Sequence, residues 1–103
     1  MSRTLLLTDN AEADLAEIWS YVAEDSSEAT ANRLIATLYT TCEKILPFPE
    51  SQPARPLIAP GLRVTFHGSY AIYYTHSPAA VTIIRVLHGA RDIGRVIADG
   101  GFH

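Results

Sequence analysis

The spacing of the apolar residues changes at a proline-rich segment, residues 47–56. Before this segment, apolar side chains recur every three or four residues, which is the period of an amphipathic helix. After it, from Leu62 onward, apolar and other side chains alternate, which is the period of a strand. Proline lacks the backbone N–H that a helix interior or a central strand uses, so we predict that the segment is a surface connector. The chain is therefore predicted to have a helical half followed by a strand half.

The helical half is predicted to contain a short first strand and two helices. Residues 3–7 are mostly apolar and read as the strand. Asp9 and Glu12 have the spacing of a capping box, which predicts the start of the first helix. A break at residues 25–27 separates it from the second helix, which Pro47 ends. Because the link between the helices is short, we expect an antiparallel helical hairpin.

The strand half is predicted to be a three-stranded antiparallel meander, because its alternating segments are joined by short turns. We expect one face to pack against the helices, formed by Leu62, Val64, Phe66, Ile72, Tyr74, Ile84 and Val86. We expect the other face to be exposed and mixed in character, formed by Arg63, Thr65, Tyr73, Ile83, Arg85 and Leu87. An exposed apolar patch of that kind usually marks a partner surface.

Together these elements predict one α+β domain over residues 1–103. A short helical segment follows the last strand, and Asp92 is predicted to be its N-cap. With 48% hydrophobic residues the chain can bury a core, and no apolar run approaches the ~20 residues of a membrane span. The single cysteine, Cys42, cannot form an internal disulfide, so we expect a cytoplasmic protein that does not engage a membrane.

Charge argues against a general nucleic-acid binder. The net charge is −3, but it is unevenly distributed. Residues 1–46 carry a net charge of −5, whereas residues 47–103 carry +2 from five arginines and three acidic residues. The second half is therefore suited to contact an anion or an acidic partner, while the whole molecule stays acidic.

The chain resembles the toxins of the RelE/ParE superfamily, and specifically the ParE branch. The resemblance extends from about residue 5 to residue 97. The matching residues are Leu7-Thr8, Ala11, Asp14-Leu15, Ile18, Tyr21, Leu46-Pro47, Pro49, Leu62-Arg63, Tyr70-Ala71-Ile72-Tyr73-Tyr74 and Ile84-Arg85-Val86-Leu87-His88-Gly89-Ala90-Arg91-Asp92. The resemblance implies two antiparallel helices on a small antiparallel sheet, in agreement with the pattern of the residues.

The resemblance also implies a function. The protein would be the toxin of a type II toxin–antitoxin system, neutralised by a small ParD-like antitoxin with a ribbon-helix-helix fold. A ParE-like toxin would inhibit growth by poisoning DNA gyrase, an activity linked to plasmid stabilisation, and would meet DNA only through gyrase or the antitoxin. The RelE branch instead cleaves messenger RNA on the ribosome. A third possibility is an inactive relative that binds only its antitoxin.

A ribonuclease needs a base, an acid and cations for the phosphate. Arg63 and Arg85 could hold a phosphate, and His88 could act as acid or base. However, the strand half contains no Lys and no Tyr after Tyr74, and strand parity separates His88 from Arg85. His88 is also expected to fix a turn by hydrogen bonding to the backbone. We therefore predict no catalytic residues and no enzyme activity, with the endoribonuclease as the alternative.

Residues that would contact the antitoxin or the target are predicted from their residue types and places, since Tyr and Arg are common interface anchors. They are Trp19, Arg63, Tyr73, Arg85, Leu87 and Arg91. Trp19 would line a groove for an antitoxin helix, or else belong to the core, with Tyr21 at the core's edge. The sequence predicts no cofactor. It also predicts no metal site, because His67, His76 and His103 have no ligand spacing with each other or with Cys42.

Overall fold

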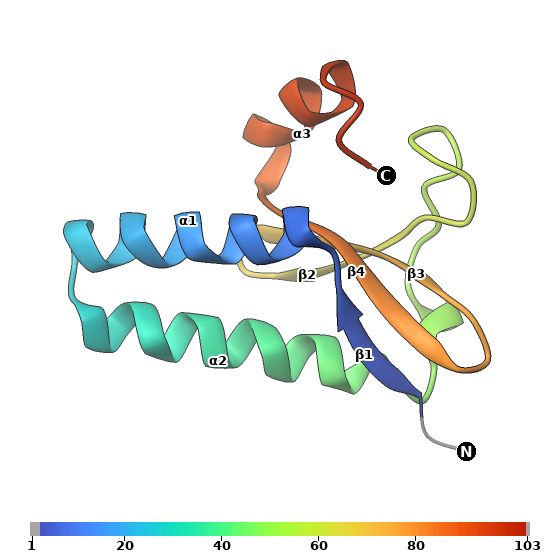
Figure 1. Ribbon diagram of the computed structural model, residues 1–103, viewed down its shortest axis with the longest axis horizontal. Coiled ribbons are helices and arrows are strands. Elements are labelled where there is room, and N and C mark those ends of the chain that lie inside the picture. The colour runs from blue at the N-terminus through green and yellow to red at the C-terminus, as the bar shows by residue number, and fades with distance from the viewer. Residues whose placement is uncertain (1–2, 103) are drawn as a thin grey trace.

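The computed structural model describes residues 3–102, apart from the side chains of Ala90 and Arg91. The order of elements confirms the predicted α+β arrangement of strand, helical hairpin, meander and short C-terminal helix (Figure 1). The elements are β1 (Thr4–Leu7), α1 (Asp9–Asp25), α2 (Glu28–Lys44), the short 3-10 helix η1 (Pro49–Ser51), β2 (Arg63–His67), β3 (Tyr70–His76), β4 (Ala80–His88) and α3 (Gly89–Ala98). Within residues 3–102, no helix is long and apolar enough to cross a membrane.

The N-cap of each helix in the hairpin is a residue with a hydroxyl side chain. Thr8 is the N-cap of α1, and its Oγ1 accepts a hydrogen bond from the backbone N–H of Ala11 at 3.0 Å. Ser27 caps α2 in the same way, accepting from the N–H of Thr30 at 3.1 Å. The predicted capping box of Asp9 and Glu12 is therefore wrong, because the helix starts one residue earlier than that pairing requires.

The sheet has four strands in the order β1-β4-β3-β2. β2, β3 and β4 form the predicted antiparallel meander, and β1 pairs with β4 in parallel. The helical hairpin, β2 and β3 all lie between β1 and β4 in the chain, which gives the long connection that parallel neighbours require. Figure 1 shows β1 beside β4, with α1 and α2 running together across one side of the sheet.

The predicted division of the sheet into a core face and an exposed face is wrong at β2. The two-residue turn after β2 places His67 opposite Tyr70, and this register places Val64 opposite Tyr73. Leu62 and Val64 therefore share the face of Tyr73, whereas Arg63 shares the face of Tyr74. Strand alternation alone could not predict this, because a register change of one residue moves every side chain of a strand to the other face.

A bulge in β4 also changes the predicted faces. Tyr73 pairs with Arg85 and Tyr74 pairs with Ile83, so Ile84 is the extra residue. As a result Ile83 packs toward the helices and Ile84 packs on the opposite face, the reverse of the prediction. A bulge places two residues against one on the neighbouring strand and so breaks the alternation along β4.

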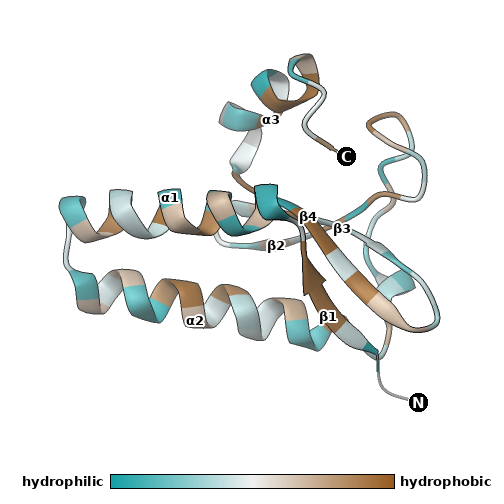
Figure 2. Ribbon diagram, in the orientation of Figure 1, coloured by the Kyte–Doolittle hydropathy of each residue, from teal (hydrophilic) through white to brown (hydrophobic). Residues whose placement is uncertain are grey.

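Both faces of the sheet are buried, and the predicted exposed face is wrong for this reason. The helix-side core contains buried residues of α1, α2, β3 and β4. The second core contains Tyr73, Ile84 and Leu87, and it is covered by Val96 of α3 together with Ile58 and Phe102. Figure 2 shows hydrophobic colouring along much of β4, as such two-sided burial demands. Phe66, predicted to be in the core, is instead 55% exposed.

The proline-rich segment closes the outer edge of β2. The backbone N–H of Val64 donates to Pro53 O at 3.0 Å, and Arg63 Nη1 donates to Gln52 O at 2.6 Å. The hydroxyl of Tyr74 donates to Pro49 O beneath it. Pro49 is buried, so the connector is a structural part of the sheet edge rather than a loose surface loop. Covering an edge strand in this way removes a template for unwanted strand pairing.

β1 pairs only with the first part of β4. Along the C-terminal part of β4, α1 occupies the position that a neighbouring strand would otherwise take. β1 ends opposite Ile83, where the N–H of Thr8 still donates to Ile83 O and its hydroxyl donates to Ile84 O. Farther along, Asp14 Oδ2 accepts from the N–H of Val86 at 3.0 Å. The carboxylate of Asp14 also receives Arg85 in a two-point contact, with Nε and Nη2 each at 2.7 Å. The Asp14 carboxylate thus accepts a hydrogen bond from the backbone of β4 and also neutralises the charge of Arg85.

We expect Asp14→Ala to destabilise the fold by about 2–4 kcal/mol, because it leaves a mostly buried guanidinium and a buried N–H without their acceptor. Asp14→Asn keeps one acceptor oxygen, so its stability should lie between that of Asp14→Ala and that of the unchanged protein. Urea unfolding followed by circular dichroism measures both. Asp25→Ala, at the exposed far end of α1, is the matched control and should change stability by no more than about 0.5 kcal/mol. Equal effects at the two positions would contradict this role for Asp14.

Candidate functional site

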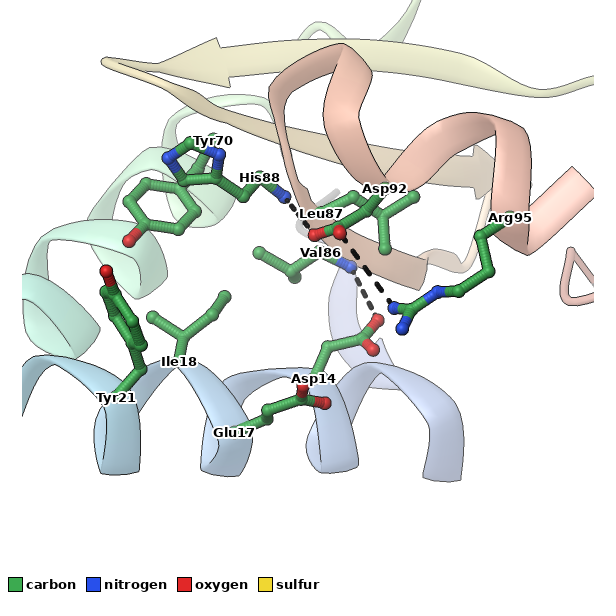
Figure 3. A pocket seen from close by; sticks show the side chains of 10 residues that line it. All are labelled: Asp14, Glu17, Ile18, Tyr21, Tyr70, Val86, Leu87, His88, Asp92 and Arg95. Carbon is green, nitrogen blue, oxygen red and sulfur yellow. Dashed lines mark hydrogen bonds and ion pairs between the residues drawn. The ribbon is translucent and has the colours of Figure 1, made fainter.

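A pocket of about 180 Å³ lies between α1 and the junction of β4 with α3 (Figure 3). Its lining residues are Asp14, Glu17, Ile18, Tyr21, Tyr70, Val86, Leu87, His88, Asp92 and Arg95. Figure 3 shows the hydroxyl groups of Tyr21 and Tyr70 pointing toward one another at one end, with Asp14, Asp92 and Arg95 at the other. The pocket is therefore aromatic at one end and charged at the other.

The charged end is organised by the Asp14–Arg85 pair. The side chains of Arg85 and Asp14 are only 14% and 10% exposed. The hydrogen bonds to Asp14 raise the pKa of Arg85 above its ordinary value, so Arg85 stays charged at every pH that the fold survives. Arg85 Nη1 also donates to Gly101 O at 3.3 Å, which ties the C-terminal residues to the sheet. Arg85 is thus committed to contacts within the protein.

His88 closes the sheet and begins α3. Its backbone N–H donates to Asp92 Oδ2 at 3.2 Å, and its ring meets Tyr70 edge-on with the centroids 5.3 Å apart. Its Nδ1 is buried without a hydrogen-bond partner, so the turn is fixed through the backbone of His88 and not through its imidazole. Asp92 is not the N-cap of α3, because the helix begins at Gly89, whose φ is +53°.

The candidate ribonuclease residues do not converge. Arg63 lies on the face of Tyr74, whereas Arg85 is paired across the strands with Tyr73 on the opposite face. Arg63 is bound to the carbonyls of Glu50 and Gln52, and Arg85 to Asp14. His88 lines the pocket, which Arg63 does not reach. The structure therefore does not bring Arg63 and Arg85 together beside the imidazole of His88.

The predicted contact residues occupy several different places. Tyr73 and Leu87 are buried in the second core, so they cannot meet a partner while α3 covers that face. Burial also raises the pKa of Tyr73. Arg63 and Arg85 are held internally, and their predicted exposure was wrong because both faces of the sheet are covered. Arg91 belongs to α3, but its side chain lies outside the described residues.

Trp19 lies in an open groove on the outside of the helical hairpin. The groove is lined by Glu12, Leu15, Ala16, Trp19, Ile35 and Tyr39. Trp19 Nε1 donates to Asn32 Oδ1 at 2.8 Å, which fixes the indole across the two helices. Tyr21, expected at the core's edge, is 63% exposed and points to the pocket instead. The contact role of Trp19 remains a prediction, and its position is compatible with it.

Sequence reasoning missed Asp14, Glu17, Tyr70 and Arg95 as site residues. Asp14 offered one signal, since it directly precedes Leu15 in the apolar stripe of α1, at the edge of the buried face. Nothing in the spacing of the other three distinguishes them from ordinary surface residues. They meet only because α1 and α3 flank the same end of β4.

Comparison with known proteins gives the family. The family model for the ParE toxin of the type II toxin–antitoxin system parDE matches residues 5–93. The chain belongs to the ParE toxin family. It is thus the toxin of a type II toxin–antitoxin system, as the motifs of the sequence implied. A search of curated protein sequences finds no match.

Solved structures confirm the toxin's fold. One is the chromosomal ParDE system from P. aeruginosa, with a TM-score of 0.72 and 17% identity, covering 84% of this chain and 96% of that one. Another is the toxin–antitoxin complex RelBE2 from Mycobacterium tuberculosis, with a TM-score of 0.65 and 22% identity, covering 87% of this chain and 94% of that one. At these identities the likeness concerns the fold alone.

Neither metal chemistry nor a reactive thiol is evident among the toxin's described residues. They contain no group of three His, Cys, Asp or Glu side chains placed to hold a metal ion. Cys42 is buried in the helix-side core, and burial, with a smaller effect of the Glu43 charge, raises the pKa of its thiol to about 11. A thiol is nucleophilic only as the thiolate, so Cys42 is suited to packing.

We expect Cys42 to resist a thiol reagent such as dithionitrobenzoate at pH 8. In the folded toxin the reagent cannot reach the buried side chain, and very little of the thiol is ionised. Its labelling should accelerate only as the pH approaches about 11 or when urea unfolds the chain. Labelling in 8 M urea provides the reference rate. Rapid stoichiometric labelling of folded protein at pH 8 would show that Cys42 is accessible and contradict its place in the core.

Proposed function

We propose that this toxin acts by binding DNA gyrase and stabilising a cleaved-DNA complex, with no chemistry of its own. Membership of the ParE family supports the proposal. The observation that carries it is that Arg63 and Arg85 are each bound internally and lie on opposite faces of the sheet. A ribonuclease would need cations free to hold the phosphate beside an acid–base pair. A toxin that poisons another enzyme needs only a surface.

The gyrase assay uses the purified toxin, gyrase, ATP and relaxed plasmid. We expect supercoiling to fall with toxin concentration and linear plasmid to accumulate after the proteins are digested, because a trapped complex holds broken DNA. Adding the antitoxin first should restore supercoiling. If supercoiling continues and no cleaved DNA appears, gyrase is not the target.

The alternative, a RelE-like endoribonuclease, has one feature in its favour, the unpartnered Nδ1 of His88 beside Tyr70. Messenger cleavage in a translating extract that is lost in His88→Ala would establish it. Growth after induction of the toxin alone distinguishes both activities from an inactive relative, in which cells would divide normally.

We further propose that a ParD-like antitoxin neutralises the toxin by placing an amphipathic helix in the hairpin groove. The two solved structures belong to toxin–antitoxin systems, which supports an antitoxin partner. The groove presents Leu15, Ala16 and Ile35, with Trp19 and Tyr39 as aromatic walls. A helix bound in such a groove is held by side chains spaced three and four residues apart.

Ala16→Glu should weaken antitoxin binding by roughly tenfold or more, because it places a charge and extra bulk on the groove floor. Isothermal titration of the purified antitoxin measures the change. The matched control is Ala13→Glu, an exposed alanine of α1 that does not line the groove. Binding lost equally in both variants, or in neither, would place the antitoxin elsewhere.

A further inference from the structure

The pocket between α1 and α3 is a second recessed surface, separate from the hairpin groove. The side chains of α1 that line it, including Glu17 and Tyr21, lie on the other flank of the helix from Ala16 and Trp19. Its walls are the rings of Tyr21, Tyr70 and His88 above an apolar floor that includes Val86. At about 180 Å³ it has room for one side chain rather than for a helix.

The charge of the pocket favours a cation. Asp14 is neutralised by Arg85, and Asp92 Oδ1 lies 3.9 Å from Arg95 Nη2. Glu17 has no ion-pair partner among the described residues, so it adds a negative charge to the rim. Arg95 is 64% exposed and can move aside with little loss. A phosphate or carboxylate would meet these acidic groups and be repelled.

His88 supplies part of the aromatic wall. Its ring meets that of Tyr70 edge-on with the centroids 5.3 Å apart, and both residues line the pocket. Its Nδ1 is buried, so this atom is not exposed to a ligand in the pocket. The face of a tyrosine ring attracts a cation, so the wall favours the same charge as the acidic rim.

We propose that this pocket binds the guanidinium group of an arginine side chain presented by a protein partner. A guanidinium is planar and stacks on tyrosine and histidine rings, as the walls of the pocket allow. Its N–H donors can meet the carboxylate of Glu17 at the rim while the plane of the group packs against the aromatic wall. A lysine ammonium has the charge but lacks the planar shape. The proposal is independent of whether gyrase is the target.

The test titrates the ¹⁵N-labelled toxin with N-acetyl-arginine amide and follows backbone chemical shifts. We expect shift changes at Glu17, Val86 and His88, and at least about threefold weaker binding of N-acetyl-citrulline amide, which has nearly the same shape without the charge. The affinity for N-acetyl-lysine amide should lie between the affinities for the arginine and citrulline compounds. Equal binding of the arginine and citrulline compounds, or shifts confined to the hairpin groove, would overturn the proposal.

Two variants and one further ligand complete the test. Glu17→Gln is exposed and should weaken binding of the arginine amide about threefold, whereas Glu12→Gln, on the other flank of α1, should leave it unchanged. His88→Leu removes one aromatic wall of the pocket, and it should also weaken binding. Free arginine carries a carboxylate that the rim repels. If it binds more tightly than the amide, the ligand is a small molecule and not a protein side chain.

Discussion

The interaction on which the structure depends is the carboxylate of Asp14 against the edge of β4. β4 spans nine residues while β1 spans four, so much of that edge has no neighbouring strand. Thr8 and Asp14 provide the missing acceptors and donors from the helix that follows β1. Because backbone groups at a buried edge must be satisfied, this contact fixes α1 along β4. The positions of α2 and of the pocket walls follow from it.

The same contact determines what Arg85 can do. A guanidinium bound at two points to a buried carboxylate is held in one geometry and cannot also grip a substrate phosphate. Arg63 is engaged in a comparable way by the proline-rich segment. Arg63 and Arg85, which the sequence left available to hold a phosphate, therefore both serve to hold the fold together. Among the described residues, the hairpin groove and the pocket form two recesses, on the two flanks of α1.

This division suits a protein that works through partners. α1 carries acidic residues and no Lys or Arg, so its flanks favour partners with basic side chains near their apolar contacts. The second face of the sheet, which strand alternation predicted to be an exposed partner surface, is covered by α3 together with Ile58 and Phe102. Two separate recesses on one rigid helix allow one partner to bind without filling the site of another.

The order and type of the elements were determined by the sequence, because helical spacing up to Leu46, prolines after it and alternation from Leu62 are local signals. The motif ending in His88 and Asp92 likewise carried the family resemblance. Tertiary structure decided the rest. The register of β2 depends on how the turn after His67 closes, and the bulge at Ile84 depends on pairing with β3. The pocket joins Glu17 to Asp92, which are far apart in the chain, and their meeting depends on packing that no local spacing encodes.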